Sequence, residues 1–84
     1  MYKERNHIEF VLEDFIRTQF EGEHDGFTRD SNLFEDGYVD SINLEAFFSF
    51  IESRFDVLFR EELFFDERIT TVSGIADIIV ELKA

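Results

Sequence analysis

Apolar residues recur with the 3.6-residue period of an α-helix in separate stretches of this chain, and this spacing limits the folds open to it. In the first stretch, residues Tyr2 to Phe20, the apolar set is Ile8, Val11, Leu12, Phe15 and Ile16. Residues three and four positions apart lie on one face of a helix, and charged residues fill the places between them. The stretch is therefore predicted to be an amphipathic helix.

Two later stretches have the same period. Between Ser41 and Phe55 the apolar face consists of Leu44, Phe47, Phe48, Ile51 and Phe55. Between Val72 and Leu82 it consists of Val72, Ile75, Ala76, Ile79 and Leu82, with Thr70 or Thr71 suited to cap the start. Isoleucine and valine are dense there, so a strand is conceivable, but the spacing favours a helix. The segment between these two helices has room for one short helix, around Glu61 to Phe65.

A connection of about twenty residues separates the first two predicted helices. Its sequence, EGEHDGFTRDSNLFEDGYVD, contains Gly, Asp, Asn and Ser and has no sustained period. Loops of this length in small domains tend to be functional when they are ordered. Phe27, Leu33, Phe34 and Val39 are candidates to hold it against the core. The prediction for residues 1–84 is a single all-α domain, a small four-helix bundle of three main helices and one short one.

The chain carries 20 acidic and 8 basic residues, a formal charge of −12. The electrostatic field of so acidic a protein repels nucleic acid and anionic membranes and attracts basic protein surfaces. Twelve phenylalanines and 44% hydrophobic residues argue against a disordered acidic tail. We expect a folded protein with basic protein partners, no nucleic acid and no membrane.

Cysteine is absent, which excludes disulfides, thiolate metal sites and a cysteine nucleophile. The sequence MYKERNHIEF has no apolar segment of the kind found in signal peptides, and no run approaches the length of a membrane helix. A soluble, cytoplasmic protein is the expectation.

Residues with catalytic or metal-binding chemistry do not form a recognisable motif. His7 and His24 lie in unrelated contexts, no motif places a histidine beside a serine, and there is no glycine-rich phosphate loop. An EF-hand centred on Gly26 would lack its closing Glu, and one centred on Gly37 would put Phe34 on a ligand position. The sequence indicates neither an enzyme nor a calcium site.

A serine stands where the long connection meets the second predicted helix, in the sequence GYVDSINLEAFF. Asp40 suits the N-cap, because its carboxylate can accept hydrogen bonds from the free N–H groups of the first turn. Ser41 is then expected at or beside the first helical position. Most serines in such places only begin a helix, so this pair alone is weak evidence of function.

The surrounding pattern resembles the phosphopantetheine attachment region of acyl carrier proteins, in which an Asp-Ser-Leu-like triplet opens the second helix. The closing segment FFDERITTVSGIADII is similar to that family's short third helix followed by an apolar final helix. The order of helix, long loop, Asp-Ser, helix, short helix and helix covers nearly the whole chain. The resemblance therefore concerns architecture as well as motif.

The resemblance implies that Ser41 is the attachment site and that Asp40 flanks it. In the family, a phosphopantetheinyl transferase moves the arm from coenzyme A onto the serine, so the protein needs no base of its own. The arm ends in a thiol, which would carry an acyl or aminoacyl group from a loading synthetase to downstream transferases or synthases. A phosphodiester on Ser41 would sit near unsatisfied N–H groups at the positive end of the helix dipole. Carriers of this kind are usually monomers.

Partner recognition in the family uses acidic residues of the second helix and its neighbourhood. In this chain the candidates are Glu45, Glu52, Glu61 and Glu62, and Ile42 either contacts partners or folds back to the core. Asn43 and Ala46 stand where fatty-acid carriers often have acidic residues, and Arg54 adds a positive charge, so the partners are expected to differ.

The predicted core is rich in phenylalanine, with Phe47, Phe48, Phe50, Phe55, Phe59, Phe64 and Phe65. Stiff rings deform less readily than Leu or Met, so such an interior is expected to admit only a short acyl chain. The alternative function is an acidic helical interaction module with no prosthetic group, in which Ser41 is an ordinary first-turn residue.

Overall fold

A computed structural model describes residues 2–19 and 26–84. Its elements are α1 (Tyr2–Gln19), α2 (Leu44–Phe55), the 3-10 helices η1 (Glu61–Phe65) and η2 (Glu67–Thr70), and α3 (Val72–Lys83). The prediction of an all-helical chain is confirmed, and residues 2–19 and 26–84 contain no strand. Phe20, the expected end of the first helix, lies outside the described residues.

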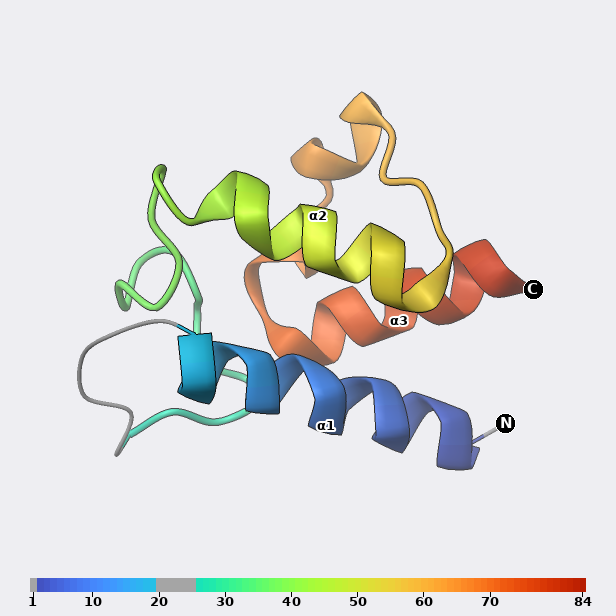
Figure 1. Cartoon of the computed structure of the whole chain (residues 1–84), viewed down its shortest axis with the longest axis horizontal. Coiled ribbons are helices and arrows are strands. Elements are labelled where there is room, and N and C mark those ends of the chain that lie inside the picture. The colour runs from blue at the N-terminus through green and yellow to red at the C-terminus, as the bar shows by residue number, and fades with distance from the viewer. Residues whose placement is uncertain (1, 20–25) are drawn as a thin grey trace.

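The three α-helices lie side by side, with the end of α3 close to the start of α1, and η1 lies beyond α2 (Figure 1). Each α-helix turns its predicted apolar face inward, except that Leu82, near the end of α3, is 40% exposed and was wrongly assigned to that face. The fully buried side chains include Ile8, Leu12 and Ile16 of α1, Phe47 and Ile51 of α2, and Val72, Ile75 and Ile79 of α3. These periodic positions are confirmed as the core, and their burial stabilises helices that would be marginal in isolation.

The long connection is held against the core by backbone hydrogen bonds as well as by side chains. Leu33 N–H donates to the Thr70 carbonyl at 2.7 Å, and Ser73 N–H donates to the Arg29 carbonyl at 2.9 Å. Phe27, Leu33 and Val39 are buried, as predicted, and Phe34 packs partly buried against them. The described part of this loop is therefore fixed to the segment where η2 passes into α3.

A buried carboxylate joins α1 to the loop. The Glu9 residue is only 4% exposed, and its Oε1 accepts hydrogen bonds from Arg5 Nη1 at 2.9 Å and from Arg29 Nη1 at 3.3 Å. Arg5 also donates to Asp77 of α3 at 2.6 Å, and Arg29 donates to Glu13 at 2.5 Å. Because both cations around Glu9 have second partners, the network ties α1, the loop and α3 together.

The start of α3 is set by a cap and by a close backbone approach. Thr71 Oγ1 accepts a hydrogen bond from Gly74 N–H at 2.9 Å, so Thr71 is the N-cap, one of the two predicted. A Cβ atom added to Gly74 would lie 2.1 Å from the Arg68 carbonyl oxygen. Only glycine therefore allows η2 to pack this closely on the first turn of α3.

None of the helices in the described part of the chain is long and apolar enough to cross a bilayer.

Candidate functional site

Ser41 lies in a single turn that leads into α2. Asp40 Oδ1 accepts hydrogen bonds from the N–H groups of Ile42 and Asn43, both at 2.9 Å, and Leu44 N–H donates to the Asp40 carbonyl at 2.9 Å. Asp40 therefore caps this turn, as the sequence indicated for the helix start. Asn43 precedes α2 and makes no side-chain cap.

The predicted start of the second helix was wrong by three residues, because α2 begins at Leu44 and not at Ser41. Ser41 and Ile42 are exposed, and Leu44 is the first apolar side chain of this segment to pack against the core. Packing stabilises the helix from Leu44 onward and does nothing for the turn before it. Ser41 is thus not in the first helical position but in the turn ahead of it.

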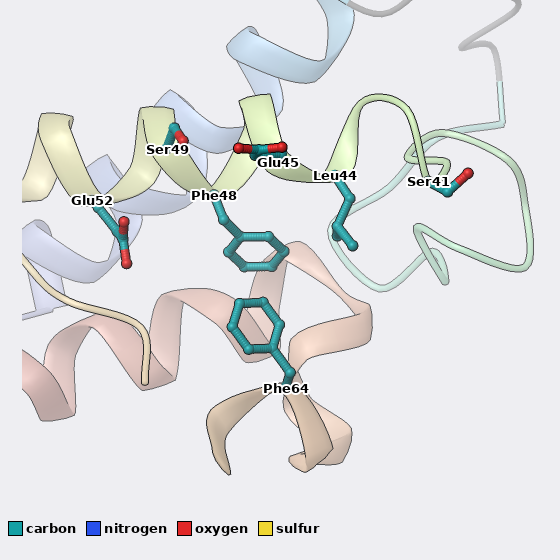
Figure 2. Close-up of a pocket in the computed structure, with 7 residues that line it drawn as sticks. All are labelled: Ser41, Leu44, Glu45, Phe48, Ser49, Glu52 and Phe64. Atoms are coloured by element: carbon teal, nitrogen blue, oxygen red, sulfur yellow. The ribbon is translucent and has the colours of Figure 1, made fainter. Parts of the chain in front are cut away.

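The hydroxyl of Ser41 is open to solvent. Ser41 is exposed, and its Oγ makes no hydrogen bond with any other residue that the structure describes. Figure 2 shows this oxygen pointing away from the rings of Phe48 and Phe64. The side chain is accessible to a second protein.

The three N–H groups that directly follow Ser41 are already used. Those of Ile42, Asn43 and Leu44 all donate to Asp40. The expectation that an anion on Ser41 would meet unsatisfied N–H groups is therefore wrong for these three residues.

A pocket of about 380 Å³ opens beside Ser41, between α2 and η1. Its apolar wall consists of Leu44 and Phe48 from α2 and Phe64 from η1, and its polar rim consists of Ser41, Glu45, Ser49 and Glu52 (Figure 2). Phe48 meets Phe64 edge to face, with ring centroids 5.1 Å apart and an interplanar angle of 76°. Ser41 and an apolar surface thus border one cavity.

The pocket wall on the η1 side is held to α2 by two kinds of contact. Phe59 packs against both Phe48 and Phe64, with centroid distances of 5.3 and 6.4 Å. Glu52 Oε2 accepts a hydrogen bond from Phe59 N–H at 2.8 Å. The connection to η1 is therefore anchored at Phe59 before it reaches the pocket.

The predicted partner residues fall into two groups. Ile42, Glu45, Glu61 and Glu62 are exposed, and Ile42 is 84% exposed, so it does not fold back to the core. Glu52 is half-buried and holds Phe59, which gives this carboxylate a structural role that the sequence did not indicate. Ser41, Glu45 and Glu52 share the pocket, whereas Glu61 and Glu62 begin η1.

Two of the phenylalanines assigned to the core lie elsewhere. Phe64 is 41% exposed and faces the pocket, and Phe65 is 84% exposed. A 3-10 helix has three residues per turn, so three consecutive residues point in three directions. Leu63 takes the inward direction and packs against the core, which turns Phe64 toward Phe48 and Phe65 outward. The sequence offered no period long enough to show this.

The charged residues between η1 and α3 form a compact cluster. Arg68 donates to Asp66 from its side chain, at 2.8 Å for Nη2, and from its backbone N–H at 2.9 Å, and it also binds Glu81. The side-chain and backbone hydrogen bonds from Arg68 lower the pKa of Asp66. The side-chain hydrogen bonds to Asp66 and Glu81 raise the pKa of Arg68. Asp66 is also the cap of η2.

His7 is exposed and lies 3.3 Å from Arg54 through Nε2, and His24 lies outside the described residues. Within residues 2–19 and 26–84 no group of three potential ligands could hold a metal ion.

No family model matches the sequence, and no curated protein and no solved structure matches it significantly.

Proposed function

We propose that this chain is a carrier protein of the acyl-carrier type, which bears a phosphopantetheine arm on Ser41. The observation that carries the proposal is the exposed hydroxyl of Ser41, next to Asp40 and on the rim of a pocket with an apolar wall. The arm supplies a terminal thiol, which would hold an acyl or aminoacyl group as a thioester. The chain itself would present this group to enzymes and would catalyse nothing.

The surroundings of Ser41 fit an arm that another protein attaches. Esterification needs a hydroxyl that a transferase can reach, and Ser41 is exposed in a turn whose backbone Asp40 fixes with three hydrogen bonds. A base within the chain is unnecessary, because the family's transferase brings the chemistry. An ordered turn holds the serine in one position, which reduces the entropy lost when the transferase binds.

The pocket supports a short cargo. Leu44, Phe48 and Phe64 offer apolar surface next to the attachment point, and the two rings pack on each other and on Phe59. A short acyl group on the arm would find apolar contacts there, and a long chain would have to displace packed rings. We infer a role in a fatty-acid, polyketide or other specialised biosynthetic pathway.

The fold as a whole supports the same assignment. The three α-helices with η1 and η2 between α2 and α3 would correspond to the three main helices and the short helix of an acyl-carrier-like bundle. The described part of the long loop would correspond to the connection that leads to the attachment serine. The exposed carboxylates Glu45, Glu61 and Glu62 would attract basic surfaces of partner enzymes in a cytoplasmic setting.

The second candidate is an acidic helical interaction module without a prosthetic group. The same exposed carboxylates favour it, because they suit a basic partner whether or not an arm is present. In this case Ser41 would only belong to the turn that precedes α2.

Incubation with coenzyme A and a broad-specificity phosphopantetheinyl transferase separates the two functions. The carrier gains the mass of one phosphopantetheine, and Ser41→Ala gains none. Ser49→Ala is the matched control, because Ser49 is also exposed and lines the same pocket, and it should gain the mass in full. A folded wild-type protein that stays unmodified beside a working positive control would favour the module.

A further inference from the structure

Phe65 is the most exposed aromatic side chain of the described residues, at 84%. A phenylalanine left almost fully in water makes no use of its large apolar surface, and aromatic side chains of this kind are enriched at protein interfaces. It makes no ring contact with another described residue. The fold therefore does not account for it.

Phe65 is held outward by a rigid support. On its N-terminal side, Phe64 packs on Phe48, and Phe59 is bonded to Glu52. On its C-terminal side, Asp66 N–H donates to the Leu63 carbonyl at 3.1 Å, and the Asp66 carboxylate is bonded to Arg68. Both neighbours of Phe65 are thus fixed, so the ring projects from an ordered backbone and loses little entropy when a partner covers it.

Phe65 directly follows a residue that lines the serine pocket. Its neighbour Phe64 lines the same pocket as Ser41, so a protein that reaches Ser41 comes close to η1. Ile42, directly after the serine, is also 84% exposed. Two exposed apolar side chains therefore stand on the two segments that border the pocket.

The charge around Phe65 indicates the kind of partner. Residues three apart in a 3-10 helix share a face, so Phe65 shares its face with Glu62. Glu61 and Glu62 are both exposed, and the whole chain carries a charge of −12. A complementary surface has an apolar depression to receive the ring and basic side chains around it.

We propose that Phe65, together with Ile42, is the apolar anchor by which a basic enzyme surface docks when it acts on Ser41. The proposal rests on the carrier function. In this arrangement the exposed carboxylates speed the association with the basic surface. The Phe65 ring on η1 slows the dissociation of the complex.

The test measures the kinetics of arm attachment by a broad-specificity phosphopantetheinyl transferase. Phe65→Ser should raise KM for the carrier at least about tenfold with little change in kcat, since a covered phenylalanine contributes that much to affinity. Phe65→Leu should recover most of the loss, because it keeps an apolar side chain. Phe10→Ser is the matched control: Phe10 is 59% exposed on α1, beside the groove between α1 and α2, and should stay within about twofold of wild type.

Each outcome is decisive. An unchanged KM for Phe65→Ser, in a protein that is primed normally, overturns the anchor and leaves the carrier function standing. An equal loss in Phe10→Ser would show a general effect of surface hydrophobicity and would also overturn it. A folded wild-type chain that accepts no arm overturns both proposals together. Thermal unfolding of every variant separates docking from folding, because an 84% exposed ring contributes little to stability.

Discussion

Phe48 and Phe64 meet edge to face across the gap between α2 and η1, with their ring centroids 5.1 Å apart. This pair forms the inner wall of the pocket beside Ser41 and holds η1 in place. Substitutions in this ring pair are therefore expected to lower stability. Substitution of Ser41, which lies on the rim and not in the wall, is expected to affect arm attachment.

Phe64→Ala is expected to lower the free energy of unfolding by about 1–2 kcal/mol, less than a fully buried Phe→Ala because the ring is 41% exposed. Urea denaturation measures it. Arm attachment to Ser41 should continue, because the turn that holds the serine is fixed by hydrogen bonds to Asp40, and these bonds do not depend on the Phe64 ring. Phe65→Ala, the adjacent substitution, should change stability by less than about 0.5 kcal/mol. Equal losses for the two rings would contradict the geometry of η1.

Glu52→Ala removes the acceptor for Phe59 N–H and should destabilise the protein by about 1–2 kcal/mol. Glu52→Gln should cost less, because the amide oxygen can still accept the bond. Glu45→Ala, at an exposed carboxylate of the same helix, is the control and should stay within about 0.5 kcal/mol of wild type. Amide hydrogen exchange at Phe59 gives an independent reading, and fast exchange in Glu52→Ala alone is the expected pattern. Slow exchange there in all variants would count against this bond.

Gly74→Ala should destabilise the fold by at least about 2 kcal/mol, because the added Cβ would meet the Arg68 carbonyl at 2.1 Å and backbone must move. Gly26→Ala is the matched control, since a Cβ there meets nothing within 4 Å. The midpoint of thermal unfolding compares the two. A Gly74→Ala protein as stable as wild type would mean that η2 does not pack this closely on α3.

Asp66 should make stability depend on acid. Hydrogen bonds from Arg68 lower its pKa below the ordinary value of 3.8, so its stabilising contribution is complete above that value and is lost as the pH falls through the lowered pKa. Wild type should therefore exceed Asp66→Asn in stability at about pH 5, and the difference should shrink toward about pH 2.5. Urea midpoints at the two pH values measure this. If the stability difference between wild type and Asp66→Asn grew as the pH fell, the stabilising role of the ionised Asp66 carboxylate would be contradicted.

The helices were predictable because their apolar residues are periodic over many turns. Val72, Ile75 and Ile79 follow one another at spacings of three and four residues, which share one face in a helix but not in a strand, and their burial follows directly. The start of α2 was not predictable in the same way. Asp40 caps a turn whose next residues are exposed, and sequence alone does not show that packing begins at Leu44.

The site was predictable in part. The Asp-Ser pair and the carboxylates were visible as residue types, but the pocket depends on η1 lying beside α2, which brings Phe48 and Phe64 together across 16 positions in the chain. The outward direction of Phe65 depends on the tighter 3-10 turn. The pairing of Glu9 with Arg29 likewise joins residues 20 positions apart, and no local pattern indicates it.

Fragmentation mass spectrometry of the protein, after reaction with coenzyme A and the transferase, tests most directly whether Ser41 bears the arm. We expect one phosphopantetheine on the peptide that contains Asp40 and Ser41, with the added mass on Ser41. Attachment to another serine, such as Ser49 or Ser31, or no attachment to the folded protein, would contradict it.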